Sequence, residues 1–351
     1  MEITKKQILD ALSYVIEPNL KKDVVTLGLV SNIQIDGNVV SFNLKVNNPA
    51  MHNRKRIIDA CTHHLQSKVA KDISPEIKVE ALPKEAERPS NQRKVLPGVK
   101  KIIAVASGKG GVGKSTVTAN LAAGMAKLGK KVGLVDADIY GPSAPIMFDV
   151  MHEKPKVQPI EGNNFMIPVE SYGVKILSIG FFSDVNQAVV WRGPMASKAL
   201  TQMFTDAYWG SLDYLFIDLP PGTGDIHLTI VQSIPLDGVV IVSTPQPVAL
   251  ADAKKGVAMF QMPNINIPVL GMIENMAYFN PPELPEKKYF IFGQEGVVKL
   301  AEQLNVPLLG QIPLVENIRQ AGDVGRPVVL QENNLQADAF VALCKTIDEA
   351  K

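Results

Sequence analysis

The amino-acid sequence predicts an α/β protein in which a mostly parallel sheet is flanked by helices, with a small α+β domain ahead of it. Short continuous apolar runs alternate with helical patterns from about residue 99 onward. Runs that are apolar on both faces are typical of parallel strands covered by helices on both sides. A glycine-rich loop joins the first run to a helical pattern, and a stretch rich in proline and charge precedes that run.

Residues 1–82 have the pattern of the small α+β domain. Apolar residues at helical spacing predict helices over 8–16 and 57–69. Between them, two alternating segments around a turn predict a β-hairpin over 33–46. Alternation over 77–81 predicts a closing strand.

Residues 83–98 are interpreted as a linker because proline and charged residues dominate them. The larger domain then spans 99–351. Val117, Leu121 and Met125 recur at helical spacing and predict a helix directly after the glycine-rich loop. The apolar runs that predict its buried strands are 102–105, 132–135, 214–217, 239–242 and 269–273.

Composition excludes several classes of protein. The chain has 351 residues, 46% of them hydrophobic, and a formal net charge of +1. That charge provides no general attraction to nucleic acid or to anionic lipid. Two cysteines, Cys61 and Cys344, do not make a disulfide framework. With no signal-peptide pattern and no apolar run long enough to span a membrane, a cytoplasmic protein without membrane or nucleic-acid partners is expected.

The glycine-rich loop has the phosphate-binding pattern G-x-x-x-x-G-K-[ST]. Glycines let backbone N–H groups approach phosphate oxygens, and the following helix N-terminus adds its positive dipole end. Lys114 is expected to reach the β- and γ-phosphates, and the Ser115 hydroxyl to ligate Mg²⁺. The predicted nucleotide-binding residues here are Gly108, Lys109, Gly110, Gly111, Val112, Gly113, Lys114, Ser115 and Thr116.

A dinucleotide-binding site is the alternative. Gly108, Gly110 and Gly113 also satisfy G-x-G-x-x-G, and Asp136 ends the next apolar run, where a ribose-binding carboxylate would lie. Residues 114–116 decide in favour of a nucleoside triphosphate, because a dinucleotide site does not require Lys-Ser-Thr at that point.

Carboxylates follow two of the predicted strands. Asp218 ends one strand, which is the position of a Mg²⁺-contacting carboxylate, and residues 220–225 after it form a loop that could sense the γ-phosphate. Asp136 and Asp138 follow another strand, and Asp138 is the better candidate to hold the attacking water. A carboxylate at a strand end also serves as a helix cap or turn residue, so this simpler role stays open.

Lys109 is the second lysine of the loop. The string Gly-Lys-Gly-Gly-Val-Gly-Lys-Ser-Thr resembles the deviant phosphate loop of the class that includes MinD, ArsA and the nitrogenase iron protein. In that class the extra lysine crosses a dimer interface to the nucleotide of the partner. The resemblance implies that Lys109 acts in trans and that the working unit is a homodimer.

A closer resemblance is to the Mrp/ApbC family of ATP-binding iron–sulfur cluster carriers. The segments that carry it are 136–143, 191–195, 218–225, 274–279 and 310–314. Residues before 83 resemble the MIP18-like domain often fused ahead of that family. The resemblance implies a slow ATPase that uses Mg²⁺ and interacts with iron–sulfur client or assembly proteins. It also implies that Asn275 hydrogen-bonds the adenine and that the segment near Pro313 lines the base pocket.

The sequence departs from that family where a Cys-x-x-Cys pair usually follows the Asn-Met-x-Tyr-Phe segment. Residues 278–285 contain no cysteine, and neither does the proline-containing segment 48–52 of the small domain. Cys61 and Cys344 lie among apolar residues at helical spacing, which is typical of core packing. Glu283 or His52 remain conceivable ligands, although iron–sulfur chemistry favours sulfur. Ligands for a cluster are therefore not identified, and the insertion 281–288 is interpreted as a proline-stiffened loop at the dimer face.

Three functions compete. The first is an ATPase that carries or delivers iron–sulfur clusters, and the second is an ATP-gated dimeric scaffold that binds a client without a cluster. The third is a positional ATPase of the MinD type that binds membrane through a terminal amphipathic helix. Residues 335–351 have an apolar stripe, but acidic residues on the opposite face favour a helix that packs on the core.

Overall fold

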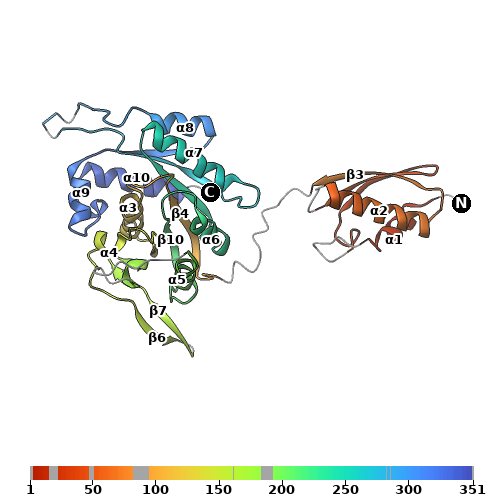
Figure 1. Ribbon diagram of the computed structural model, residues 1–351, viewed down its shortest axis with the longest axis horizontal. Helices are drawn as coiled ribbons and strands as arrows, with labels where there is room; N and C mark the ends of the chain where they lie inside the picture. Colours follow the sequence, from red (N-terminus) through yellow and green to blue (C-terminus); the bar gives the residue numbers. More distant parts are fainter. Residues whose placement is uncertain are drawn as a thin grey trace. The chain divides into compact units, whose positions relative to one another are not determined.

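The computed structural model describes residues 3–15, 23–46, 51–81, 95–160, 162–182, 193–281, 283–284 and 286–349 (Figure 1). The chain divides into two compact units, Met1–Glu87 and Arg88–Lys351, and each is described by itself. Most of the segment interpreted as a linker, residues 83–94, lies outside the described residues.

The small unit is a three-stranded sheet with two helices on one face. Its elements are α1 (Lys5–Leu12), β1 (Val30–Asp36), β2 (Val39–Val46), α2 (Met51–Lys68) and β3 (Ser74–Ala81). The strands lie in the order β1-β2-β3, with β1 and β2 antiparallel and β2 and β3 parallel. Phe42 and Leu44 of β2 are buried with Cys61 and Leu65 of α2 in one apolar core. The hairpin, the second helix and the closing strand are confirmed. The first helix, predicted over 8–16, is present but ends at Leu12, and Ile16 lies outside the described residues.

The hairpin differs from simple alternation in its first strand. The pairing register shifts between Ser31 and Gln34, and Asn32 has a positive φ of 54°. An extra residue of this kind reverses the face of the residues beyond it. Ile33 and Ile35 therefore lie on the same face as the buried Val40, with which Ile35 pairs. Ile33 packs against the core, whereas Ile35, close to the hairpin turn, is 36% exposed.

The large unit is built on an eight-stranded sheet, parallel except where its edge strand β8 meets β9. The strand order is β13-β12-β11-β4-β10-β5-β9-β8. The strands are β4 (Val99–Ala106), β5 (Val132–Asp136), β8 (Val169–Ser171), β9 (Val174–Ser178), β10 (Leu212–Asp218), β11 (Gly238–Ser243), β12 (Val269–Asn275) and β13 (Leu308–Ile312). Every strand predicted from an apolar run is present, and β6 (Lys156–Ile160) and β7 (Asn163–Ile167) form a separate antiparallel hairpin that the sequence patterns did not predict.

Helices cover both faces of this sheet, and neighbouring strand residues pack into opposite cores. Ile102 and Ala104 of β4 lie in one core, while Ile103 and Val105 lie in the other. The helices on the first face are α5 (Gly193–Thr205), α6 (Asp225–Ser233), α7 (Pro247–Gln261) and α8 (Gly296–Leu304). Those on the second are α3 (Lys114–Lys127), α4 (Ala144–Met147), α9 (Glu316–Asp323) and α10 (Leu335–Glu349), with 3₁₀ turns at Ile179–Phe182 and Val328–Leu330.

The C-terminal helix α10 packs on the core as predicted. Phe340, Leu343 and Ile347 are at most 3% exposed, and α10 lies against α3. Leu335, which the stripe placed on the same face, is 80% exposed because it begins the helix outside the packed turns. Among the described residues, no helix is long and apolar enough to cross a membrane.

The strand order concentrates loops at one place. β4 lies between β10 and β11, so the chain leaves the central strand toward both halves of the sheet. In open α/β sheets, ligands bind beyond the carboxyl ends of the strands at such a switch point. The sequence-predicted site residues lie at the carboxyl ends of β4, β5, β10, β12 and β13 or directly after them, and these strand ends are at the same edge of the sheet.

Candidate nucleotide-binding site

The glycine loop connects β4 to α3 and is shaped by three of its glycines. Gly111 and Gly113 have φ values of 82° and 80°, a region that side chains with a Cβ rarely adopt. Gly108 packs on α7, since a Cβ there would lie 2.2 Å from the backbone carbonyl carbon of Asp252. A Cβ at Gly111, by contrast, would meet no atom within 4 Å. The loop therefore has a fixed base and an open outer side.

Helix α3 begins at Lys114, and no side chain caps its N-terminus. The N–H groups of its first turn are thus available to an external acceptor, and the helix dipole favours an anion there. Open space at Gly111 together with uncapped N–H groups is an arrangement that fits phosphate oxygens.

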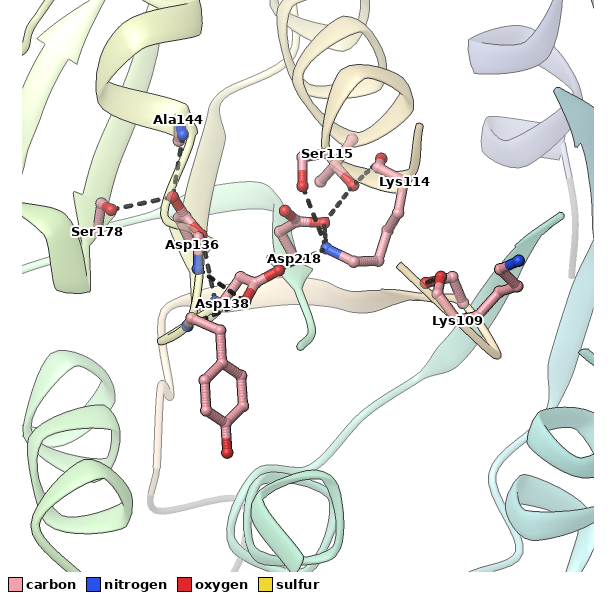
Figure 2. A network of polar contacts seen from close by, with 12 residues as sticks. Lys109, Lys114, Ser115, Asp136, Asp138, Ala144, Ser178 and Asp218 are labelled. Carbon is pink, nitrogen blue, oxygen red and sulfur yellow. Dashed lines mark hydrogen bonds and ion pairs between the residues drawn. The ribbon is translucent and has the colours of Figure 1, made fainter. Parts of the chain in front are cut away.

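Lys114 is the centre of a buried polar network (Figure 2). Its side chain is 5% exposed, and its Nζ lies 2.7 Å from Oδ1 of Asp218, 3.2 Å from Oγ of Ser115 and 3.8 Å from Oδ2 of Asp138. Thr118, one turn along α3, donates a hydrogen bond of 2.8 Å to the same oxygen of Asp218. One ammonium therefore balances two carboxylates that are taken out of water.

Asp136 and Asp138 have different surroundings although both follow β5. Asp136 is fully buried, and its carboxylate accepts hydrogen bonds from the backbone N–H groups of Asp138 and Ala144 and from the Ser178 hydroxyl. Burial, followed by the charge of Asp218, raises the pKa of Asp136 to about 7. A carboxylate enclosed in this way is not available to a ribose, which argues against the dinucleotide interpretation.

Asp138 instead faces Lys114. Its Oδ1 accepts from the backbone N–H groups of Tyr140 and Gly141 at 3.2 and 3.3 Å, a turn that fixes the side chain. Its Oδ2 is the oxygen nearest to the Lys114 ammonium. The turn role and a role toward substrate use different oxygens, so one does not exclude the other.

The loop after β10 is tied to the glycine loop. The N–H of Gly222 donates to the carbonyl of Ser107 at 2.9 Å, and Gly222 has a φ of 92°. Helix α6 follows, and its His227 is 1% exposed with no hydrogen-bond partner for Nε2 among the described residues. Burial, together with the charge of Lys114, lowers the pKa of His227 to about 4. This imidazole is therefore neutral at physiological pH.

Asn275 ends β12, and Pro313 directly follows the end of the neighbouring strand β13 at the same edge. Asn275 pairs with Ile312 in the register of β12 and β13, and Pro313 follows Ile312 directly. The Asn275 Nδ2 donates to the carbonyl of Val112 at 2.8 Å, and a Cβ on Gly113 would lie 2.2 Å from that nitrogen. Asn275 thus supports the glycine loop, while its Oδ1 accepts no hydrogen bond from the described residues.

Lys109 stands apart from this network. Its side chain is half-exposed and forms no ion pair with the described residues. Figure 2 shows it directed away from Lys114 and from the carboxylates, on the outer side of the loop. The two lysines of one loop therefore have opposite environments.

Sequence reasoning missed three residues of this site. Thr118 binds Asp218, Ser178 binds Asp136, and His227 borders the network. Thr118 follows Lys114 by one helical turn, and this spacing could have predicted it from the sequence. Ser178 and His227 come from separate elements, so no local sequence pattern indicates them.

A thiolate or metal-ligand cluster is not formed by the residues suggested for it. Cys61 and Cys344 are both buried and lie in different units. Glu283 is exposed, and segment 48–50 and the His52 side chain lie outside the described residues. Within the part of the chain that the structure describes, no three His, Cys, Asp or Glu side chains gather as a metal site.

Comparison with known proteins gives the family. The model of the NUBPL iron-transfer P-loop NTPases matches residues 98–348, and that of the iron-sulfur cluster assembly proteins matches residues 5–79. An iron-sulfur cluster carrier protein of Synechocystis is 44% identical over 98% of this chain and 97% of its own length. One of Aquifex aeolicus is 41% identical over 99% of this chain and 96% of its own length.

Solved structures agree on the fold. A nucleotide-binding protein of Archaeoglobus fulgidus in complex with ADP is 37% identical, with a TM-score of 0.60 over 71% of this chain and 95% of its own. The cell division ATPase MinD of Pyrococcus furiosus shares the fold at 24% identity, with a TM-score of 0.51 over 72% of this chain and 99% of its own. The glycine loop, the strand order and these matches lead to one conclusion: the chain belongs to the NUBPL iron-transfer family of P-loop NTPases, with an iron-sulfur cluster assembly domain ahead of the NTPase domain.

Proposed function

We propose that this chain binds and hydrolyses ATP with Mg²⁺ as a homodimer, and that it uses this cycle to carry or deliver iron–sulfur clusters. The observation that carries the proposal is the convergence of Lys114, Asp138 and Asp218 beneath an open glycine loop. The relatives at 44% and 41% identity, both called iron-sulfur cluster carrier proteins, support the cargo.

Phosphate oxygens would compete with Asp218 and Ser115 for the Lys114 ammonium, which both residues contact. When Lys114 turns to the phosphates, the Ser115 hydroxyl and the Asp218 carboxylate become free to hold Mg²⁺, directly or through water. Bound Mg²⁺ would neutralise charge that develops on the transferring phosphoryl group. Thr118 keeps Asp218 oriented during this exchange, because its hydroxyl donates to that carboxylate.

Asp138 is the proposed acceptor for the attacking water. Its Oδ1 is fixed by two backbone N–H groups, and this leaves Oδ2 to accept a hydrogen bond from water near the γ-phosphate. Phosphoryl transfer depends mainly on such positioning and on charge stabilisation, since little covalent chemistry is required of the protein.

Asn275 and Pro313 are the proposed base contacts. The Asn275 Nδ2 is engaged by Val112, so the remaining Oδ1 is suited to accept from the exocyclic amino group of adenine. Guanine has an oxygen at the corresponding position, so two hydrogen-bond acceptors would face each other there. A preference for ATP over GTP is expected from this arrangement.

Lys109 is proposed to act on the nucleotide of a second copy. It lies on the outer side of the loop, away from its own carboxylates. A cation placed there by a partner would stabilise charge in the transition state, as other cations supplied in trans do.

The test uses Lys109→Ala beside Lys255→Ala, a control that removes an exposed lysine paired only with Asp252 one turn earlier in α7. Lys109→Ala is expected to keep ATP affinity but to lose ATP-dependent dimerisation, and to slow turnover by about 10³-fold. Sedimentation with and without Mg²⁺-ATP measures dimerisation, and phosphate release measures turnover. Unchanged sedimentation and turnover in Lys109→Ala would refute action in trans.

A further inference from the structure

The thiols of this chain are its least expected feature. The whole sequence contains two cysteines, Cys61 and Cys344, and both are 0% exposed. Iron–sulfur clusters are usually held by several cysteine thiolates. These two side chains are therefore the entire thiolate supply that the chain could offer to a cluster.

Cys344 is enclosed between α10 and α3. Its Sγ donates to the carbonyl of Leu121 at 3.5 Å, and a Cβ on Gly124 would lie 2.6 Å from the same sulfur. Helix α3 therefore has a glycine where the sulfur packs. Burial raises the pKa of this thiol to about 12, so the neutral form is kept.

Cys61 occupies the equivalent situation in the small unit. It lies on α2 between Ile57 and Leu65, one turn away on either side, and all three pack in the apolar core of that unit. Burial raises the pKa of Cys61 to about 12 as well. Each sulfur lies in the interior of its own unit, so exposing either one to iron requires opening that unit's core.

Among the described residues, other side chains do not replace the thiolates. No group of three His, Cys, Asp or Glu side chains gathers within the described residues. The exposed loop around Glu283 and Lys287 presents oxygen and nitrogen, which iron–sulfur chemistry disfavours relative to sulfur.

We infer that this chain contributes no thiolate to an iron–sulfur cluster, and that the thiolates come in trans from a second, thiol-bearing molecule that the chain engages. The inference rests on the proposed carrier function and states where the ligands come from. No bond forms between iron and a sulfur of this chain, and the ligands of the second molecule stay on the metal.

The test reconstitutes the full-length chain anaerobically with ferrous iron and sulfide in three buffers. The first contains a phosphine reductant and no thiol, the second adds glutathione, and the third adds a synthetic four-cysteine peptide. After gel filtration, iron and acid-labile sulfide are measured in the fraction that contains the chain. The expected result is background iron in the phosphine buffer and iron with the chain in at least one thiol buffer.

Several outcomes are decisive. Stoichiometric iron in the phosphine buffer overturns the inference: loss in Cys61→Ala or Cys344→Ala would identify a thiol of the chain, and retention in the variant that lacks both cysteines would identify oxygen or nitrogen ligands. Iron that accompanies the chain in neither thiol buffer overturns supply in trans. Iron only with glutathione identifies a small thiol as a sufficient source, and iron only with the peptide identifies a protein thiol.

A second measurement does not depend on folded variants. Alkylation of the native chain with iodoacetamide, read by mass spectrometry, should leave both thiols unmodified until denaturant is added. Rapid alkylation of either thiol under native conditions would overturn the inference. ATP binding is measured on the same preparation: its loss would count against the proposed function and leave the thiolate result intact.

Discussion

The large unit buries ionisable groups in two regions, and the two regions keep them in opposite states. At the carboxyl edge of the sheet, Lys114 is 5% exposed and Asp218 is 2% exposed, and the two form an ion pair at 2.7 Å. In the interior, Cys344 is 0% exposed among apolar side chains and is held neutral by burial. Similar burial therefore accompanies charge in one region and neutrality in the other.

The two regions differ in the hydrogen-bond and ion-pair partners of the buried groups and in whether open space lies beside them. Asp218 receives an ammonium and a hydroxyl, and the loop above it has open space at Gly111. Among the described residues, the Cys344 thiol donates a hydrogen bond to the carbonyl of Leu121 and is otherwise packed in the apolar core. Buried polar groups indicate a functional site where several charged groups lie together beside space that a ligand could occupy. Burial alone does not indicate such a site.

The largest effect is expected for Lys114→Ala, which breaks the charged region. Turnover should fall by about 10²–10³-fold or more, because the cation that faces the phosphates is removed. The free energy of unfolding without nucleotide should also fall, by about 3–5 kcal/mol, since Asp218 is left buried without its ammonium. Phosphate release and urea denaturation measure the two effects.

Lys255→Ala is the matched control, because it removes an exposed lysine of the same unit. It should change the unfolding free energy by less than about 1 kcal/mol. If Lys114→Ala were as mild as this control in both assays, the assignment of the charged region would be wrong.

The next effect is expected for Asp138→Asn. Asparagine keeps an oxygen that can accept from Tyr140 and Gly141, so the turn should persist while the negative charge is lost. Turnover should fall by about 10²-fold with ATP affinity within a few fold of the parent. Normal turnover in Asp138→Asn would limit Asp138 to its turn.

Much of the charged region can be predicted from local sequence. Lys114, Ser115 and Asp218 were found because a loop motif and a strand end each leave a pattern within a few residues. The buried strands were found for the same reason, since continuous apolar runs directly reflect burial on both faces.

What the sequence left out depends on contacts between distant elements. The edge strand β8, its neighbour β9 and the hairpin of β6 and β7 are too short and too mixed in polarity to give a pattern. Ser178 reaches Asp136 across two neighbouring strands, and such pairing appears only once the sheet order is known. The bulge in β1 likewise depends on local backbone conformation at Asn32.

The interior region is tested by Gly124→Ala. The added Cβ would lie 2.6 Å from the Cys344 Sγ, so the variant should lose about 1–3 kcal/mol of unfolding free energy through overpacking. In a Cys344→Ala background the sulfur is gone and the nearest atom is Cγ2 of Val329 at 3.1 Å, so the same substitution should cost less than in the parent, by about 1 kcal/mol or more.

This double-mutant cycle in urea separates packing from function. ATP turnover should stay near the parent value in both Gly124→Ala and Cys344→Ala, since neither residue belongs to the charged region. An effect of Gly124→Ala that is equally large in both backgrounds would mean that the sulfur does not fill that space.

The last test concerns His227, which combines features of both regions: it is buried like the thiol, and the charge of Lys114 helps to lower its pKa. Its folded pKa of about 4 lies below the ordinary 6.5, so its contribution to stability is present above pH 6.5 and is lost as the pH falls toward 4. His227→Leu removes that titration and the unpartnered Nε2. The unfolding free energy of His227→Leu should therefore match or exceed that of the parent at pH 7.5 and decline less steeply between pH 6.5 and 4, as measured by urea denaturation.

The control is His152→Leu, which replaces an exposed histidine and should keep the parental slope. An unchanged slope in His227→Leu would mean that this imidazole is protonated as readily in the folded chain as in the unfolded one.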